Sequence, residues 1–330
     1  MPKPTLRIIW LGCLLLLIGF LLHVGIGSTF WYNPLAIVLE ILRGPVGDNY
    51  TNNVIWNLRL PRACYCLFVG ASLGVCGAAL QTLFRNPLAE PYVVGASSGA
   101  AIGGALTLGL GLSEGLLIVV KPLAGFVTGL LTLLLVTRLS RRNGVIETPS
   151  LLLAGVVVST MLSSLLSLIV LESGKDQGVL LRWLLGSMST AFWWPVLLLA
   201  VSFFVGFSLL YRASRKLNAL AVGEDTAASV GIDVHRLRNQ ILVIVTAMVA
   251  ITVGPVGIIG FIGLVAPHIA RSLVGVDLRK TLPLSAIAGS SLLLASDAIA
   301  QRGPQGTELP VGIVTAILGA PSLLILMRRR

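Results

Sequence analysis

Asp297 has the most unusual placement in the sequence, because it is an acidic side chain deep within a late apolar stretch. A charge at the centre of a bilayer costs about 2.5–3.5 kcal/mol on insertion scales, so another group must compensate it. Asp297 could act as a proton relay or as a substrate ligand. Alternatively, it lies near the outer end of a membrane span and is neutralised by Arg302 or by backbone groups. We favour this second interpretation, because a proton-coupled carrier usually has more than one such group.

A run of hydroxyl side chains is the second candidate for chemistry. Its members lie at i, i+4 spacing on adjacent faces of one expected helix: Ser159, Thr160, Ser163 and Ser164. Such a stripe could line a translocation path. The hydroxyls could equally donate hydrogen bonds to the preceding turn of their own helix, and the sequence favours neither interpretation.

Motifs of nucleotide binding and of metal binding are absent from the sequence. The chain has no GxxxxGK[ST], HExxH or CxxC motif. The histidines are scattered (His23, His235 and His268), and the cysteines lie in apolar stretches, where small buried side chains are expected (Cys13, Cys64, Cys66 and Cys76). We therefore expect no enzyme activity, no metal site and no cofactor on this chain.

The composition indicates which elements position these residues. Of 330 residues, 55% are hydrophobic and 11% are charged, and the mean hydropathy is +0.93. Soluble proteins have about 25% charged residues, and a membrane helix needs about 20 apolar residues. We predict an all-α membrane protein with a single domain over residues 1–330 and about ten transmembrane helices. The expected spans are residues 8–27, 63–83, 93–112, 115–137, 149–171, 190–211, 240–257, 258–273, 282–300 and 309–327.

Glycines and prolines indicate where these helices pack and where they break. The spacing of Gly70 and Gly74, and of Gly95, Gly99 and Gly103, predicts close approach between helices. The two prolines in the segment Arg85 to Pro91 predict a bend. The Gly/Pro cluster at residues 254–263 predicts a tight turn or a broken helix between the seventh and eighth spans.

The basic residues predict the orientation in the membrane. With ten spans, 17 of the 24 lysines and arginines fall on the side that holds both termini, which the positive-inside rule assigns to the cytoplasm. The net charge of +11 then reflects topology, and nucleic acid is not an expected partner. Residues 28–61 form a periplasmic loop, whose amphipathic stretch Pro34 to Leu42 predicts an interfacial helix. Residues 212–240 form a cytoplasmic loop, in which Leu217 to Gly231 predict a short helix with Glu224 and Asp225 near its N-terminus.

Five motifs carry a family resemblance. They are RLPR at 59–62, QTLFRNPLAEP at 81–91, ALAVGEDTAASVGID at 219–233, GFIGLVAPHIAR at 260–271, and ELPVG at 308–312 followed by GAP at 319–321. In this order and across nearly the whole chain, they resemble the permease subunits of type II ABC importers, the FecCD-like family that imports ferric siderophores, haem and cobalamin. The resemblance implies that fold, and a location in the bacterial inner membrane as a multi-pass protein.

The resemblance also implies partners. A second permease copy would form a dimer with the translocation path along its interface, and a periplasmic binding protein would deliver the substrate. Two cytoplasmic ATPase subunits would bind ATP and Mg. Coupling to the ATPase is implied for the loop at 219–233, at Leu220, Gly223, Glu224, Asp225, Ala228 and Gly231.

Docking of the binding protein is implied for three arginines, expected to be exposed on the periplasmic side: Arg59, Arg62 and Arg302. Arginine suits this role because its planar fork can bind a carboxylate with two hydrogen bonds. Anchoring among lipid headgroups is the alternative. The loop at 302–308 departs from a typical member, because it is rich in Gly and Pro, so the placement of Arg302 is the weakest of the three. Arg271 is expected to cap its helix or to meet lipid phosphate.

Two questions stay open at the level of sequence. An ion-coupled secondary transporter is the alternative function, and only Asp297 points to it. The motifs belong to a scaffold that importers of haem, siderophores and cobalamin share, so they do not select a substrate. We lean towards an iron complex, because such importers are the commoner members of the family.

Overall fold

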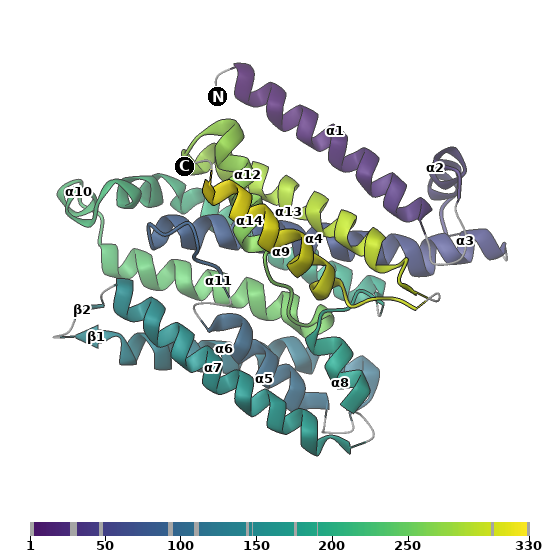
Figure 1. Cartoon of the computed structure of the whole chain (residues 1–330). Helices are drawn as coiled ribbons and strands as arrows, with labels where there is room; N and C mark the ends of the chain where they lie inside the picture. Colours follow the sequence, from purple (N-terminus) through teal and green to yellow (C-terminus); the bar gives the residue numbers. More distant parts are fainter. Residues whose placement is uncertain are drawn as a thin grey trace.

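The structure, a computed structural model, describes residues 3–26, 32–45, 49–91, 95–108, 112–142, 145–146, 148–174, 177–189, 191–304 and 307–328. Nearly all of these residues are helical (Figure 1). A two-residue antiparallel ladder, β1 (Arg141–Arg142) with β2 (Val145–Ile146), is the one sheet in the part described. The predicted all-α class is therefore confirmed.

The helices are, in chain order, α1 (Lys3–Gly25), α2 (Pro34–Arg43), α3 (Tyr50–Val54), the π-helical turn η1 (Ile55–Arg59), α4 (Leu60–Leu83), α5 (Ala96–Leu108), α6 (Glu114–Leu139), α7 (Thr148–Glu172), α8 (Gln177–Leu184), α9 (Trp193–Val222), α10 (Glu224–Ser229), α11 (Val234–Val256), α12 (Ile262–Val274), α13 (Leu278–Ala300) and α14 (Val311–Arg328). Each of the ten expected stretches overlaps one of these helices. Seven of the described helices are long and apolar enough to cross a membrane, and the residues 262–274 and 311–322 form shorter apolar helices.

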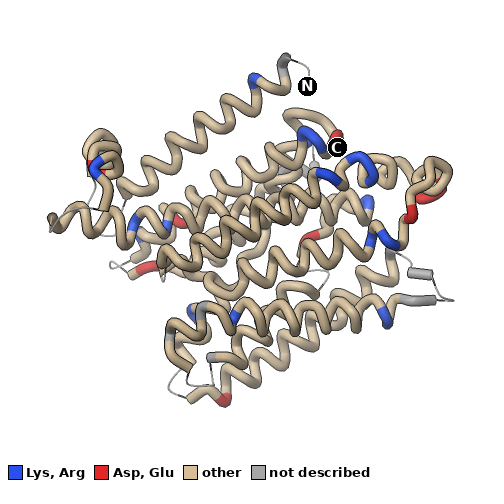
Figure 2. The backbone as a smooth tube through the Cα atoms, turned by 180° about the vertical axis from the view of Figure 1, so that it is seen from behind, with Lys and Arg blue, Asp and Glu red and all other residues tan. Residues whose placement is uncertain are grey.

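The long helices run side by side between two ends of the molecule (Figure 1). Both termini, α10 and the β1–β2 ladder lie at one end, called here the termini end. The short helices α2, α3 and α8 lie at the opposite end, called here the α2 end. Figure 2 shows Lys and Arg positions along the backbone at both ends, with few charged positions between them. A bundle with charged ends and an apolar middle has the form expected of a membrane protein.

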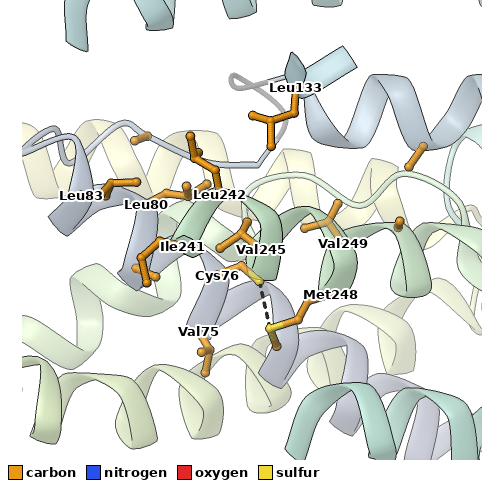
Figure 3. Close-up of a cluster of buried hydrophobic side chains, with 14 of the residues drawn as sticks. Val75, Cys76, Leu80, Leu83, Leu133, Ile241, Leu242, Val245, Met248 and Val249 are labelled. Carbon is orange, nitrogen blue, oxygen red and sulfur yellow. Dashed lines mark hydrogen bonds between the residues drawn. The ribbon is translucent and has the colours of Figure 1, made fainter. Parts of the chain in front are cut away.

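Helix α4 lies inside the bundle, where it packs against α13, α9, α12 and α11. A Cβ atom at Gly74 would collide with the carbonyl oxygen of Ser285 on α13, and one at Gly70 would collide with that of Gly289. These glycines therefore allow the backbones to touch, as their spacing predicts. On the other side of α4, apolar side chains of α4, α6 and α11 form a common core (Figure 3). Within it, Cys76 and Met248 place their sulfur atoms 3.7 Å apart.

Two expected helix boundaries were wrong. The second span does not begin near residue 63, because α3, η1 and α4 form one helix from Tyr50 to Leu83. Pro61 follows the π-helical turn, in which the backbone N–H of Leu60 donates to Ile55, so the change from π to α hydrogen bonding falls at the residue that has no N–H to donate. The segment Leu217–Val222 does not belong to the short helix of the loop, because α9 continues to Val222.

Other expectations about local structure fared better. Helix α2 forms at the amphipathic stretch, with Asn33 as its N-cap. The segment from Arg85 to Pro91 is not helical, as its prolines predict. Residues 257–261 form an irregular connection between α11 and α12. Cys13 departs from the expectation of buried cysteines, because its side chain is exposed on α1.

Candidate functional site

A buried ion-pair network lies at the α2 end, where α1, α4 and α13 meet. The Asp297 carboxylate has no exposed surface. It accepts hydrogen bonds from Arg62 at both oxygens, from Nε to Oδ2 at 2.8 Å and from Nη2 to Oδ1 at 3.0 Å. Its Oδ2 also lies 2.8 Å from Nε2 of His23 and 3.0 Å from the Gln301 amide. We call His23, Arg62, Asp297 and Gln301 the Asp297 cluster.

The Asp297 cluster explains how an acidic residue is accommodated in an apolar helix. The expectation that Arg302 or backbone groups neutralise Asp297 was wrong, because Arg62 does so and His23 adds a hydrogen bond. A bidentate guanidinium is the strongest partner available to a buried carboxylate. Neither partner is close in sequence, which is why the pattern around Asp297 did not reveal them.

Arg62 also reaches the surface. Its Nη1 donates to Oε1 of Glu308 at 2.8 Å, and Glu308 lies in the segment between α13 and α14 with 35% of its side chain exposed. The Arg62 side chain itself is 14% exposed. The expectation of a fully exposed cation at this position was therefore wrong, and Arg62 instead connects a buried carboxylate to an exposed one.

Arg59 and Arg302 have different surroundings. The Arg59 guanidinium donates to the backbone oxygens of Val24 and Gly25 at 3.1 and 2.8 Å, and it lies 4.5 Å from the ring centre of Tyr32. A cation at the last carbonyls of α1 interacts favourably with the helix dipole. Arg302 follows α13 and is exposed. Of the three predicted docking arginines, only Arg302 is exposed, and the docking role stays a prediction for all three.

One group in the described part of the chain has the composition of a metal site. His23, Cys66 and Asp297 place potential ligand atoms within 4.8 Å of one another. Both oxygens of Asp297 already accept from Arg62, however. A divalent cation there would lie beside a fixed positive charge at low dielectric constant. The geometry therefore fits an ion pair better than a metal centre.

The predicted coupling loop lies at the termini end. Helix α10 contains Glu224 and Asp225 in its first turn, as predicted. Asp225, Ala228 and Gly231 are exposed, and Gly223 is half-buried. Gly231 has a φ of +80°, a conformation that favours glycine. The loop therefore presents a small, acidic, mostly exposed surface.

Two predicted coupling residues are engaged inside the subunit. Leu220 is 1% exposed and belongs to the core, so it supports the loop from below. Glu224 forms an ion pair with Arg238 at 2.7 Å, and the Arg238 side chain is 4% exposed. In contrast, Val222 and Val230 on either side of α10 are 74% and 66% exposed. Sequence reasoning missed these two valines, although apolar residues in a polar loop could have signalled a contact surface.

A polar brace holds the base of the loop. Asn218 near the end of α9 donates to Oδ1 of Asp277 at 2.8 Å and accepts from the backbone N–H of Leu278 at 3.0 Å. Asp277 also caps α13 by accepting from Arg279. Burial acts to raise the pKa of Asp277, but the hydrogen bonds from Asn218 and Arg279 hold that pKa below its usual value. The brace ties α9, which leads into α10, to the start of α13.

The hydroxyl stripe of α7 divides into two parts. Thr160 and Ser164 lie on the exposed face and donate to the carbonyl groups of Val156 and Thr160, at 2.9 and 3.1 Å. Ser159 is buried, and Ser163 is half-buried. Thr160 and Ser164 therefore form the hydrogen bonds to the preceding turn that were one of the two interpretations. A role of the four hydroxyls in lining a translocation path stays a prediction.

Arg271 was expected to cap its helix or to meet lipid. It lies in the last turn of α12 and donates to Oε1 of Gln81, whose amide donates to the backbone oxygen of Gly263 at 3.0 Å. These contacts join α4 to α12 at the termini end. The motifs around residues 81 and 271 thus meet in space.

Comparisons with known proteins agree with this architecture. A family model described as the FecCD transport family matches residues 15–329. The cobalamin import system permease protein BtuC of Halobacterium salinarum is 39% identical over 277 residues, which cover 84% of this chain and 74% of that protein. The vitamin B12 import system permease protein BtuC of Escherichia coli (strain SE11) is 37% identical over 331 residues. That alignment covers 96% of this chain and 94% of the relative.

A solved structure is similar over the whole length. It shows a metal-chelate type ABC transporter in an inward-facing conformation, with a TM-score of 0.85 and 31% identity. The alignment covers 98% of this chain and 99% of that one. The similarity therefore extends over the complete bundle.

Proposed function

This chain belongs to the FecCD transport family, and from that premise we propose that it is the permease subunit of an ATP-driven importer of a bulky metal chelate. The single observation that carries the proposal is the family match over residues 15–329. Two copies of the chain would form the translocation unit, with ten spans each and with both termini in the cytoplasm. It would lie in the inner membrane of a bacterium as a multi-pass protein.

The coupling loop supports an ATPase partner at the termini end. An ABC permease does not hydrolyse ATP itself, so two ATPase subunits with ATP and Mg would bind on the cytoplasmic side. Helix α10 offers them Asp225, Ala228 and the flanking Val222 and Val230, all exposed. Small and apolar side chains around one acidic residue form a surface suited to a cleft in a partner.

The α2 end would receive a binding protein that carries the cargo. Arg62 is fixed by Asp297 and already holds one exposed carboxylate, that of Glu308. A carboxylate of the binding protein could take the place of Glu308 at the same guanidinium atom. Exposed Arg302 would add a second contact, whereas Arg59 would stabilise the end of α1.

The surroundings of Asp297 do not support the alternative function, an ion-coupled carrier. Asp297 suggested it, but this carboxylate is in an ion pair with Arg62 and a hydrogen bond with His23. A coupling site must bind and release an ion during transport. A carboxylate held by a bidentate arginine is poorly suited to that task.

The cargo is proposed as a cobalamin or an iron chelate such as haem or a ferric siderophore. The two permeases compared above are named for cobalamin and vitamin B12 import, and the solved structure for a metal chelate. These names favour cobalamin over the iron complex expected from the sequence. They concern the relatives, so the cargo of this chain must be measured.

Uptake into proteoliposomes tests the proposal. The chain is reconstituted with its cognate ATPase and binding protein, and cobalamin, haem and a ferric siderophore are offered in turn. We expect uptake of one chelate that requires both ATP and the binding protein. Vesicles with a Walker A lysine variant of the ATPase are the matched control. Uptake driven by an ion gradient without ATP would overturn the proposal.

A further inference from the structure

A groove with a volume of about 600 Å³ lies between α9 and α11, near the termini end. The two helices pack against each other, and each contributes a stripe of residues with i, i+3, i+4, i+7 spacing. The described lining consists of Leu209, Arg212, Ala213 and Lys216 on α9 and of Leu237, Asn239, Gln240, Ile241, Val243 and Ile244 on α11. Helix α10 joins the two helices at the termini end (Figure 1), so the groove lies beside the coupling loop.

The lining of the groove changes from polar to apolar along the helices. The part nearer the termini end is exposed and polar, with Arg212, Lys216, Asn239 and Gln240. One turn further from that end, Leu209 and Val243 are 41% and 42% exposed, and Ile244 is half-buried. Both helices are long and apolar enough to cross a membrane. The groove therefore suits an occupant that is polar at one end and apolar at the other.

Aromatic side chains indicate where the membrane surface meets α9. Trp194 is exposed at the start of the helix, and Tyr211 is exposed beside Arg212. Trp and Tyr are enriched at the two membrane–water interfaces. Tyr211 follows Trp194 by 17 residues, about 26 Å along the helix, which is close to the hydrocarbon thickness of about 30 Å. Arg212 and Lys216 then lie at the level of the headgroups, and Leu209 lies at the edge of the hydrocarbon.

The charge of the groove is positive. No acidic side chain is among its described lining residues. Arg238, on the adjoining part of α11, is paired with Glu224 at 2.7 Å, whereas none of the ion pairs among the described residues includes Arg212 or Lys216. Like charges at i, i+4 on a helix repel each other. An anion between these two cations would therefore stabilise α9.

We propose that this groove binds an anionic phospholipid, with its phosphate held by Arg212 and Lys216 and an acyl chain along Leu209, Val243 and Ile244. Basic pockets between membrane helices suit anionic headgroups. A soluble protein partner would match only the polar part of the groove, because Leu209 and Val243 face hydrocarbon. Only the assignment of this lipid to the cytoplasmic leaflet rests on the proposed function, through the orientation given there.

A lipid at this position would join α9 to α11 at the base of the coupling loop. Lys216 precedes the end of α9 at Val222 by six residues, about 9 Å along the helix. The polar brace of Asn218 and Asp277 lies in the same part of the molecule. The lipid would thus add a second support to the helices that carry α10.

Native mass spectrometry of the full chain in detergent tests the proposal. The chain is titrated with phosphatidylglycerol, with phosphatidylcholine of the same acyl chains, and with glycerol phosphate, which has the anion without the chains. The charge variants are R212Q/K216Q and R212K/K216R. R215Q is their matched control, because Arg215 is exposed on α9 outside the groove.

A second pair of variants tests the apolar end. V243W fills that end, and V201W is its control, because Val201 is exposed on α9 outside the lining. Elution profile and thermal unfolding verify that every variant is folded. The titrations are repeated with the dimer and with the complex that contains the ATPase.

The wild type is expected to bind one phosphatidylglycerol per chain, more tightly than phosphatidylcholine or glycerol phosphate. R212Q/K216Q should weaken the affinity for phosphatidylglycerol by about thirtyfold, because each basic residue at an anionic lipid surface contributes about fivefold. R212K/K216R should retain most of the affinity. V243W should weaken it severalfold, and R215Q and V201W should match the wild type.

Several results would overturn the lipid site. Equal affinity for the two phospholipids, full affinity in R212Q/K216Q, or an equal loss in R215Q would show that the groove does not select an anionic headgroup. Glycerol phosphate bound as tightly as phosphatidylglycerol would assign the cations to a free phosphate. Displacement of the lipid in the dimer or in the ATPase complex would assign the groove to a protein contact.

The lipid site and the proposed function fail separately. None of the titrations measures uptake, so each result above leaves the importer in place. Absence of ATP-driven uptake would overturn the proposed function and leave the affinity for phosphatidylglycerol unchanged.

Discussion

At the scale of single residues, Arg62 is the most constrained cation described at the α2 end. Three of its nitrogen atoms donate to carboxylates, two to buried Asp297 and one to exposed Glu308. Breaking a buried ion pair costs about 3–5 kcal/mol, whereas an exposed one contributes about 0–1 kcal/mol. The contact with Asp297 is therefore permanent, and the contact with Glu308 can be exchanged.

Replacing Glu308 with Gln is expected to strengthen docking of the cargo-free binding protein by about fivefold. The variant removes a competing carboxylate whose exposed ion pair contributes about 1 kcal/mol. Binding to the transporter in nanodiscs measures the effect. Glu172→Gln, an exposed carboxylate at the end of α7, is the control. Weaker or unchanged docking by Glu308→Gln would exclude Arg62 as the docking residue.

Glu90 gives a prediction of pH dependence. It lies in the bend between α4 and α5, where burial raises its pKa from 4.5 to about 7 despite a hydrogen bond from the Phe261 backbone. A raised pKa means that the folded state holds the proton more tightly. The stability linked to this proton is complete below about pH 4.5 and is lost as the pH rises through 7.

Glu90→Gln should therefore gain thermal stability relative to the wild type when the pH is raised from 5 to 7.5. The amide resembles the protonated acid and does not titrate. Melting curves of the detergent-solubilised protein at the two pH values provide the measurement, with Glu172→Gln as the control. An equal difference between variant and wild type at both pH values would show that Glu90 does not titrate in this range.

At the scale of elements, α10 is short but firmly supported. Ala227 on α10 and Leu220 near the end of α9 are buried, and Glu224 forms an ion pair with Arg238. The exposed residues of this segment are thus held in a fixed arrangement. This arrangement changes the choice of variants, because lysine at Glu224 would disrupt the fold by facing buried Arg238 with a second positive charge.

Val230→Asp should reduce co-purification of the ATPase severalfold, because a charge would be buried at the expected interface. Val276→Asp is the matched control, since Val276 is 79% exposed between α12 and α13, outside the coupling loop. Co-purification with the tagged ATPase from detergent extracts measures the effect. If both variants lose the ATPase equally, or neither does, α10 is not the coupling element.

The sequence predicted elements better than the contacts between them. Hydropathy located the seven long apolar helices of the described residues, and Glu224 and Asp225 were correctly placed in the first turn of α10. The partners of Asp297 could not be found in this way, because Arg62 and His23 are 235 and 274 residues away along the chain. Local sequence patterns indicate helix periodicity and capping, but they do not indicate which helices contact one another.

Lys121 shows a signal that was present but not used. It interrupts an apolar stretch, as Asp297 does, and the same cost of burying a charge applies to both. Its Nζ lies 5.8 Å from the ring centre of Trp183.

The extension of the second span to Tyr50 was missed for another reason. The segment with two arginines and Pro61 was interpreted as a loop, although the π-helical turn before Pro61 allows the helix to continue through it.

At the scale of the whole molecule, the two ends have separate tasks in the proposal. The termini end carries the coupling loop and the α2 end carries Arg62 (Figure 1). An importer needs such a separation, since energy is supplied on one side of the membrane and cargo arrives on the other. The orientation predicted from basic residues assigns the termini end to the cytoplasm.

Cysteine labelling tests this orientation. Arg302→Cys should react with an impermeant maleimide in intact spheroplasts, whereas Ala228→Cys should react only after permeabilisation. Both are made in a Cys13→Ser background, because Cys13 is exposed on α1. Labelling of both positions from the same side, or in the reverse order, would contradict the topology.

The unbroken helix from Tyr50 to Leu83 has a consequence for the surrounding bilayer. Its 34 residues extend for about 50 Å, whereas the hydrocarbon core is about 30 Å thick. If the apolar part of α4 fills that core, the first turns with Arg59 and Arg62 must stand above it in the headgroup region. Membrane thickness then sets how far this arginine-bearing turn emerges into water. Lipid chain length becomes a variable that tunes access to Arg62 without any change in the protein.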